Sequence, residues 1–326
     1  MDLTITKDNI KVSNNMEKKE SNRSKSNFYT KEESILHKRR QIMKEVLQNL
    51  QLNNSYNDRQ KEIEEYINKS KKYKSLNLTV ASSSLHFSKT IFSITPNGLI
   101  DKECKNIKDG IMLFGYESNS HIEEEIEEEN NKHSSIYDFI FPIENENSLY
   151  LCEFPSFCIY FDTKDENYYI KDFSVGIGAL MKIKKYKIGS ETLINIGANY
   201  LVINIKDDDI TIKIFNNSIL EKNTEQRNFD IKNFKINKKV DKLITIGRNK
   251  KCDVIIEDMM MSKIQCCIKY NSKDKAFYLY DGNSVKESMN GTWVYILNPI
   301  KITDNFTFKA EHTLFVIKII YNDKKD

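Results

Sequence analysis

The feature that most restricts the fold is a long succession of short apolar runs. From about residue 76 to the C-terminus, runs of four to eight residues rich in Ile, Val, Phe, Tyr and Leu alternate with clusters of Asn, Asp, Gly, Lys and Ser, and no helical stretch separates them. Short strands spaced this closely are typical of antiparallel β-sandwiches. Roughly sixteen such runs are too many for one sandwich and suit two. We therefore predict two β-sandwiches.

The strand-rich part of the chain also repeats itself weakly. Residues 164–172 align with residues 273–281, and residues 187–205 follow the plan of residues 301–319. A period of about 110 residues implies two duplicated domains, because solenoid repeats are much shorter. We place the boundary between a first and a second repeat near residue 207, where three consecutive Asp residues interrupt the strand pattern.

The N-terminal part of the chain differs in kind. Residues 1–28 are rich in Asn, Lys and Ser and show no periodicity, so we expect a disordered tail. A capping box at Thr30–Glu33 starts an amphipathic helical pattern, and a second helical pattern follows a break at residues 53–55. Both apolar stripes are narrow, so we expect this helical arm, residues 29–75, to pack on another domain or on a partner helix.

The predicted fold class is thus mainly β, with two tandem antiparallel β-sandwiches behind an N-terminal helical extension. The predicted domains are a disordered tail at 1–28, a helical arm at 29–75, a first sandwich at 76–206 and a second sandwich at 207–326.

Composition excludes several classes of function. No window holds the ~18 apolar residues of a membrane span, and the N-terminus lacks the apolar run of a secretory signal, so we expect an intracellular protein, nuclear or cytoplasmic, with no membrane contact. The six cysteines have no metal-binding spacing and should be reduced, buried thiols. Phosphate-loop, zinc-protease and nucleophile-elbow motifs are missing, so we expect no enzyme, no cofactor and no metal. The single Trp293 should pack in a sandwich core.

Three short motifs stand in order in the second repeat. Gly247-Arg248 ends an apolar run, a Ser-Lys-Ile-Gln stretch occupies Ser262–Gln265, and Asn-Gly-Thr occupies Asn290–Thr292. This order and spacing resembles the forkhead-associated (FHA) domain, whose signature is Gly-Arg, a Ser-Arg-x-His stretch and an Asn-Gly-Thr turn. The resemblance covers about residues 207–322, and the first repeat, residues 76–206, resembles a degenerate copy.

The chemistry of the motifs agrees with this resemblance. A phosphothreonine carries close to two negative charges and three strong acceptor oxygens, so its reader needs a cation with directional donors and additional neutral donors. Arg248 supplies a fork of donors, and Ser262 supplies a hydroxyl. The resemblance implies that both bind phosphate, that Lys263 assists, and that Asn290 binds the backbone of the ligand peptide.

Four further residues are expected to support this site: Gly247, Gln265, Gly291 and Thr292. Gln265 stands where the family has a histidine that buttresses the serine loop, and its amide can still donate and accept hydrogen bonds. Met289, before Asn290, lacks the hydroxyl that some members have there.

The first repeat lacks these groups. Phe114-Gly115-Tyr116 occupies the Gly-Arg place, Glu153 aligns with the serine, and Ser174–Ala179 stands where Asn-Gly-Thr should be. Tyrosine and glutamate offer no cation, so we expect no phosphate binding there. The run at 123–129, which is almost entirely Glu, is interpreted as a solvated acidic loop.

Three hypotheses of function follow. The first is a non-enzymatic, phosphothreonine-peptide-binding adaptor or scaffold in signalling, whose partner is a phosphothreonine-containing protein, with a helix-mediated protein partner for the arm. The second is a structural subunit of a larger assembly with no phosphate recognition. The third is nucleic-acid association through the arm, since residues 1–75 hold 17 Lys or Arg against 11 Asp or Glu. We do not expect nucleic acid as the main partner.

Overall fold

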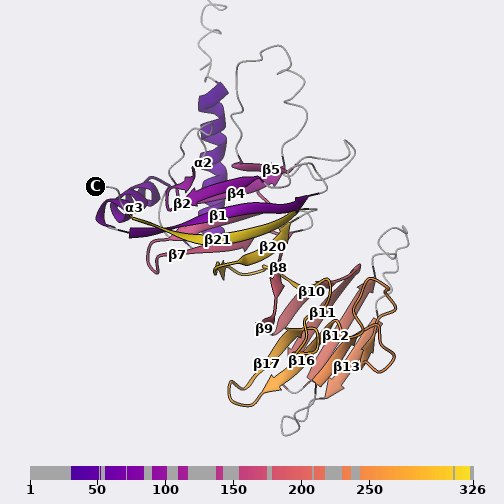
Figure 1. Cartoon of the computed structure of the whole chain (residues 1–326). Coiled ribbons are helices and arrows are strands. Elements are labelled where there is room, and N and C mark those ends of the chain that lie inside the picture. The colour runs from indigo at the N-terminus through magenta and orange to yellow at the C-terminus, as the bar shows by residue number, and fades with distance from the viewer. Residues whose placement is uncertain are drawn as a thin grey trace, which may run out of the picture.

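The computed structural model describes residues 31–50, 52, 56–70, 72–83, 90–100, 109–116, 137–141, 154–174, 178–207, 209–216, 230–235, 243–310 and 313–323. The predicted tail at 1–28 and the predicted acidic loop at 123–129 lie outside these residues. Within them the chain is mainly β, with two helices near its N-terminal end (Figure 1). The predicted fold class is therefore confirmed.

The helices of the arm are α2 (Lys31–Asn49) and α3 (Tyr56–Lys69). One apolar face of α2 packs on the outer surface of a sheet (Figure 1). The buried side chains in this contact are Met43, Val46, Leu47 and Leu50 of the helix with Ile111, Leu113, Tyr137, Cys158 and Tyr160 of the body. Burying a large apolar side chain stabilises by roughly 1.5–3 kcal/mol, so four of them attach the helix firmly. A partner helix for the arm stays a prediction.

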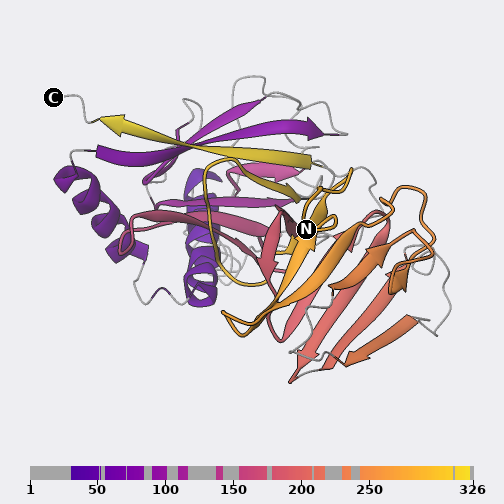
Figure 2. The same ribbon diagram turned by 60° about the horizontal axis from the view of Figure 1, so that its bottom comes forward.

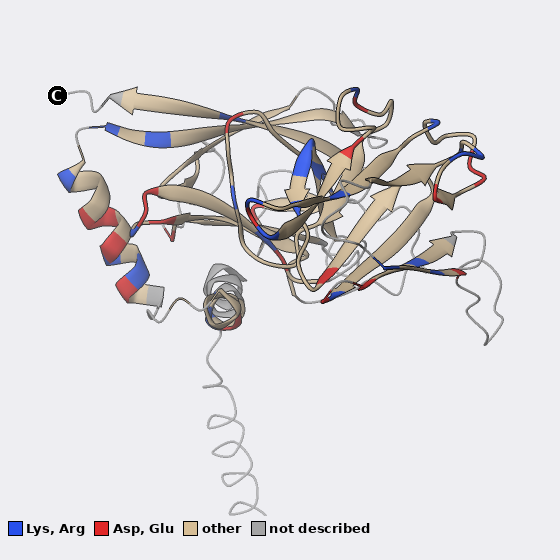
Figure 3. Ribbon diagram, turned by 90° about the horizontal axis from the view of Figure 1, so that it is seen from below, with Lys and Arg blue, Asp and Glu red and all other residues tan. Residues whose placement is uncertain are grey.

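The second helix, α3, is held by a buried arginine. Arg59 is 2% exposed, its guanidinium donates a hydrogen bond to the carbonyl of Phe161, and burial lowers its pKa. The Tyr66 ring lies 5.0 Å from the Phe161 ring. Acidic and basic residues both occur along α3 (Figure 3), so this part of the arm is not uniformly basic.

The first sandwich contains eleven strands in the part of the chain that the structure describes. These are β1 (Lys72–Ser83), β2 (Ile91–Thr95), β3 (Gly98–Leu99), β4 (Ile111–Tyr116), β5 (Phe139–Phe141), β6 (Phe157–Asp162), β7 (Asn167–Asp172), β8 (Ala179–Ile183), β19 (Ile300–Lys301), β20 (Phe306–Ala310) and β21 (Thr313–Asp323). One face has the order β3-β2-β1-β21-β20-β8, and the opposite sheet has the order β5-β4-β6-β7-β19.

In the second sandwich the described residues form ten strands. These are β9 (Lys185–Lys187), β10 (Glu191–Ile196), β11 (Asn199–Lys206), β12 (Asp209–Asn216), β13 (Asp230–Lys235), β14 (Leu243–Gly247), β15 (Val254–Ile255), β16 (Cys266–Asn271), β17 (Ala276–Asp281) and β18 (Thr292–Tyr295). One face has the order β13-β12-β11-β10-β18 and the other β15-β14-β16-β17-β9, which repeats the plan of the first sandwich.

The two sandwiches are joined by strand pairing. β8 and β18 pair antiparallel from Ile183 with Thr292 to Leu180 with Tyr295. A single eleven-stranded sheet therefore runs through both sandwiches, which lie side by side in Figure 2.

The strand order corrects the predicted domain boundary. Strands β9 to β11 belong to the first repeat but lie in the second sandwich, and β19 to β21 belong to the second repeat but lie in the first. In Figure 1 the yellow β21 accordingly runs beside the indigo β1. The predicted boundary near residue 207 falls in the tight turn between β11 and β12, where Lys206 pairs with Asp209. Neither predicted segment, 76–206 or 207–326, holds all the strands of one sandwich.

The exchanged strands contribute to the cores. In the first sandwich the Phe114 and Phe157 rings stack at 4.1 Å, and Phe308 of β20 and Phe315 of β21 stack at 4.8 Å. The rings of Phe157 and Phe308 meet edge to face at 5.6 Å. Aromatic pairs add about 0.5–1.5 kcal/mol each beyond their buried area, so the C-terminal strands stabilise the first sandwich strongly.

Four of the six cysteines lie in the described residues, and all four are buried and free: Cys158, Cys252, Cys266 and Cys267. This agrees with the prediction of reduced, buried thiols, and burial raises the pKa of each of these four thiols. Neither described helix combines the length and the apolar character needed to cross a membrane.

Candidate functional site

The predicted binding residues lie on three loops at one end of the second sandwich. Arg248 follows β14, Ser262 and Lys263 precede β16, and Asn290 precedes β18. The loops contact one another directly: the Arg248 amide donates to the Ser262 carbonyl (3.3 Å), and the Met289 amide donates to the Ser262 hydroxyl (2.9 Å). The structure thus brings together residues that are up to 42 positions apart in the sequence (290 minus 248).

The Arg248 side chain projects from this end into solvent. It is exposed, and its guanidinium makes no hydrogen bond or ion pair with any residue that the structure describes. Gly247 lets the next loop approach: a Cβ at this position would collide with the carbonyl oxygen of Lys263. The Asn249 amide donates to that same carbonyl (3.1 Å). Glycine is therefore required before the arginine for the two loops to pack.

The Ser262 hydroxyl is oriented by the neighbouring loop. Because it accepts a hydrogen bond from the Met289 amide, its own proton remains available for another acceptor. Lys263, the next residue, is exposed, so its ammonium group can approach the same ligand. Its backbone is fixed, since the carbonyl also accepts a hydrogen bond from the Cys252 thiol (3.3 Å).

Gln265 ties the loops together from beneath. It is fully buried, and its Oε1 accepts a hydrogen bond from the Ser262 amide (3.0 Å). Its Nε2 donates to the Ser288 hydroxyl and to the Gly291 carbonyl, both at 2.8 Å. One amide side chain thus satisfies groups on two loops.

The Asn290–Thr292 turn is anchored on both sides. The Asn290 amide donates to the Met260 carbonyl (2.7 Å), while the buried Thr292 hydroxyl donates to Asp281 (2.7 Å). Gly291 has a φ of 75°. Trp293 does not pack in a core, which corrects the prediction: it is half-buried, and its indole N–H donates to the Asn290 carbonyl (3.1 Å). Strand alternation explains this, since Thr292 and Val294 point inward.

Two supporting residues were not assigned a role from the sequence. The Ser288 hydroxyl accepts from the Gly291 amide (3.0 Å) and donates to Asp281 (2.7 Å). The Asp258 carboxylate accepts from the Met260 amide (2.8 Å). The signal for Ser288 was present, because Ser three residues before a turn glycine is a common local hydrogen-bonding residue. Nothing in the sequence marked Asp258.

The same end of the first sandwich differs in its side chains. Gly115 occupies the position of Gly247, since each pairs with a parallel strand in the same register, and Tyr116 then stands in place of the arginine. Ser156 occupies the position of Gln265, and its hydroxyl is buried without a partner among the described residues. Gly178, with a φ of 82°, matches Gly291. Glu153, predicted to replace the serine, lies outside the described residues.

Comparison with protein families identifies the second repeat. Residues 244–309 match the family model of the FHA domain, and this segment contains all eight predicted site residues. The comparisons with curated proteins and with solved structures gave no match. FHA domains are protein-interaction modules that bind phosphopeptides. The chain therefore contains an FHA domain, whose matched segment begins in β14 and ends in β20.

Proposed function

We propose that the chain is a non-enzymatic adaptor that binds a phosphothreonine segment of a partner protein through the loop end of the second sandwich. The observation that carries the proposal is the Arg248 guanidinium, which is exposed and has no partner among the described residues. The loops around it are fixed by hydrogen bonds, so the site is organised before a ligand arrives. A rigid frame around an uncompensated cation favours an anionic ligand.

The donors divide into two groups. Arg248 offers a planar fork of N–H donors, which suits bidentate contact with phosphate, and Lys263 offers a second positive charge. Ser262 offers a neutral hydroxyl. One N–H of the Asn290 side chain donates a hydrogen bond to the Met260 carbonyl. Its other N–H and its oxygen remain available for the backbone of an extended peptide.

Part of the rim of the site is apolar, because three methionines are exposed there. Met259 is 93% exposed, Met260 68% and Met289 88%, and they lie on the two loops that meet at Asn290. Methionine side chains are flexible and adapt to varied apolar partners. We expect the partner segment to carry apolar residues close to its phosphothreonine.

The decisive experiment is a titration of the full chain with phosphothreonine peptide libraries, followed by Arg248→Ala. Trp293 is the only tryptophan, and it hydrogen-bonds the Asn290 carbonyl, so its fluorescence reports directly on the site. Each charged hydrogen bond to phosphate contributes roughly 1.5–3 kcal/mol, and ~1.4 kcal/mol changes affinity tenfold. Arg248→Ala should therefore weaken binding at least about tenfold.

The matched control is Lys273→Ala, which removes an exposed cation from the turn between β16 and β17. It should bind like the wild type. Phosphoserine and unphosphorylated versions of the best peptide test the preference for phosphothreonine. Equal affinity of the wild type and Arg248→Ala would remove the proposal and leave the structural-subunit hypothesis, in which phosphatase treatment does not release partners.

A further inference from the structure

The two repeats exchange their last three strands. The turns of β6–β7 and β16–β17 are equivalent: Tyr169 donates to Asp165 (2.5 Å) in one, and Tyr278 donates to Asp274 (2.9 Å) in the other. The residues after these carboxylates, 166 and 275, have φ angles of 56° and 50°. The strand that pairs beside each turn can therefore be compared directly.

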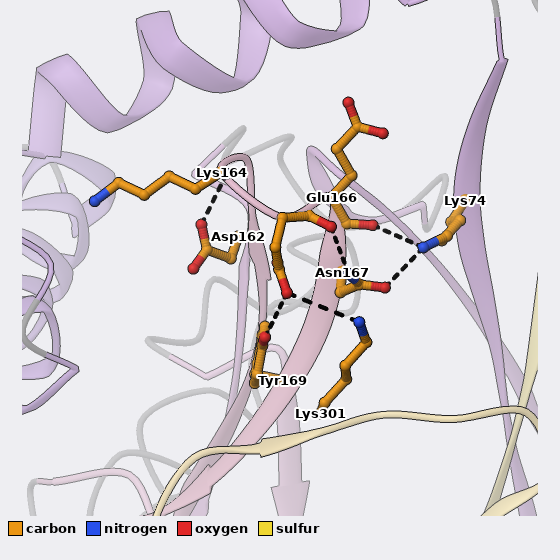
Figure 4. A network of polar contacts seen from close by, with 8 residues as sticks. Lys74, Asp162, Lys164, Glu166, Asn167, Tyr169 and Lys301 are labelled. Carbon is orange, nitrogen blue, oxygen red and sulfur yellow. Dashed lines mark hydrogen bonds and ion pairs between the residues drawn. The ribbon is translucent and has the colours of Figure 1, made fainter.

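Beside each turn lies a strand of the other repeat. Lys301 of β19 pairs with Tyr169, and Lys187 of β9 pairs with Tyr278. The Lys301 ammonium lies 3.9 Å from the Asp165 carboxylate. Figure 4 shows Lys301 beside Tyr169. The chain passes from β8 to β9 through Lys184 alone. Such short connections favour exchange, because they leave little chain for folding back.

The exchange places a turn of the first repeat behind the loop that carries Ser262, which is one of the proposed phosphate-binding residues. The turn joins β10 to β11, and two of its donors reach the same oxygen, Oδ2 of Asp258: the Ala198 amide (3.1 Å) and the Asn199 side-chain amide (3.0 Å). Asn199 is 2% exposed, and the Asn195 side chain donates to its carbonyl (3.1 Å). The Asp258 carboxylate is thus held by the first repeat.

Asp258 in turn fixes the loop that carries the serine. Its other oxygen accepts from the Met260 amide (2.8 Å), and its carbonyl accepts from the Met261 amide (3.1 Å). Met260 then accepts the Asn290 amide (2.7 Å), and Ser262 lies one residue after Met261. Two of the predicted binding residues therefore depend on the geometry of Asp258.

The corresponding turn of the second repeat is unsuited to this place. Strand register makes Ile196 equivalent to Ala310, so Glu311 is the sequence equivalent of Gly197. A Cβ on Gly197 would lie 2.5 Å from the Asp258 carboxylate, and its φ is 58°. A glutamate there would clash and would add like charge, whereas glycine avoids both.

We propose that the phosphopeptide-binding unit is a composite of both repeats, in which Asn199 of the first repeat is a positioning residue for the loop that carries Ser262. The proposal rests on the proposed function of the second sandwich. It implies that residues 207–326, although they contain the family match, lack a necessary part of the site.

Engineered cysteine pairs in the full chain test the exchange without any ligand. Lys187→Cys with Tyr278→Cys places two thiols on directly paired residues, within reach of a disulfide. Lys187→Cys with Tyr169→Cys is the matched control, because Tyr169 is the equivalent residue in the first sandwich. Mild oxidation and peptide mass spectrometry should find an intrachain disulfide in the first pair. A disulfide in the control pair instead would overturn the composite arrangement.

A binding experiment tests the positioning role. Asn199→Asp replaces the donor to Asp258 with a second carboxylate, and we expect the phosphothreonine peptide to bind at least tenfold more weakly. Asn204→Asp makes the same change five residues later on β11 and should have no effect. Asp258→Asn, added to Asn199→Asp, removes the like-charge contact and should recover part of the affinity, which simple unfolding would not allow.

The outcomes separate the two proposals. If Arg248→Ala and Asn199→Asp both weaken binding while Asn204→Asp does not, the composite site is supported. If Arg248→Ala weakens binding and Asn199→Asp binds like the wild type, the positioning role is overturned and the proposed function stands. If the wild type binds no phosphopeptide, both binding statements fail, while the cysteine pairs still decide whether the sandwiches are composite.

Discussion

The loop ends of the two sandwiches share one strand framework and use it differently. In the second sandwich a buried amide, Gln265, bonds groups on two neighbouring loops and leaves Arg248 exposed above them. In the first sandwich the equivalent residue is Ser156, whose hydroxyl is buried without a partner among the described residues. The comparison teaches that one strand framework carries different side chains at the position that holds two loops together in the second sandwich.

The largest expected effect comes from removing the central amide. Gln265→Ala leaves the partly buried Ser262 amide and the buried Gly291 carbonyl without their partner, and each such group costs about 1–3 kcal/mol. We expect the free energy of unfolding of the second sandwich to fall by about 2–4 kcal/mol. Denaturant unfolding followed by Trp293 fluorescence measures this, since Trp293 lies in β18.

Gln265→His sharpens that test. An imidazole can also donate and accept, so this variant should keep most of the stability and of the phosphopeptide affinity. If Gln265→Ala lost less than about 1 kcal/mol, the loops would be held by other contacts, and the contrast between the sandwiches would not rest on this residue.

Much of the architecture could be predicted from local pattern. Alternation alone places Leu76, Leu78 and Val80 on one face, and all three are fully buried in β1. The order of three motifs was sufficient to predict that Arg248, Ser262 and Asn290 meet at one end. The alternation of side chains along β18 would also have placed Trp293 on the outer face, because its neighbours Thr292 and Val294 point inward.

The strand exchange could not be predicted, and the reason is physical. β9 pairs beside Tyr278, but the equivalent position in the other sandwich also carries a tyrosine, Tyr169. Because β9 could pair equally well beside Tyr278 or beside Tyr169, its local sequence does not show which of the two sandwiches it joins. The same holds for Asp258 and Asn199, which are 59 residues apart and meet only because of the exchange.

A second prediction concerns the contact between the two sandwiches around β20, β10 and β18. We call it the junction, and equivalent residues of the two repeats meet there. Lys309 of β20 corresponds to Asn195 of β10, and its ammonium donates to the Asn195 side chain (2.6 Å) and lies 4.8 Å from the Trp293 ring. Burial lowers the pKa of Lys309 to about 8, below its usual 10.5. Between these two pH values the unfolded chain holds more protons than the folded chain, so this lysine makes stability increase with pH.

Lys309→Met should remove that increase. We expect the free energy of unfolding of the wild type, measured relative to Lys309→Met, to rise by on the order of 1 kcal/mol between pH 7.5 and 9.5. Below pH 7.5 the difference between the two proteins should be constant, since the lysine is then charged in both states. A parallel pH dependence of the two proteins would show that this ammonium is solvated, and the junction would not be a buried contact.

The smallest effect is expected at Ser156, and its sign is what matters. A buried hydroxyl without a partner destabilises the folded state, because it loses its hydrogen bonds to water and gains none. Ser156→Ala should therefore leave the free energy of unfolding unchanged or raise it by up to about 1 kcal/mol, measured by circular dichroism during denaturant unfolding. Replacing a polar side chain by alanine would then destabilise the second sandwich in Gln265→Ala. It would not destabilise the first sandwich in Ser156→Ala, at the equivalent position. A loss of more than about 1 kcal/mol in Ser156→Ala would mean that this hydroxyl is bonded in the folded protein, and the contrast between Ser156 and Gln265 would then fail.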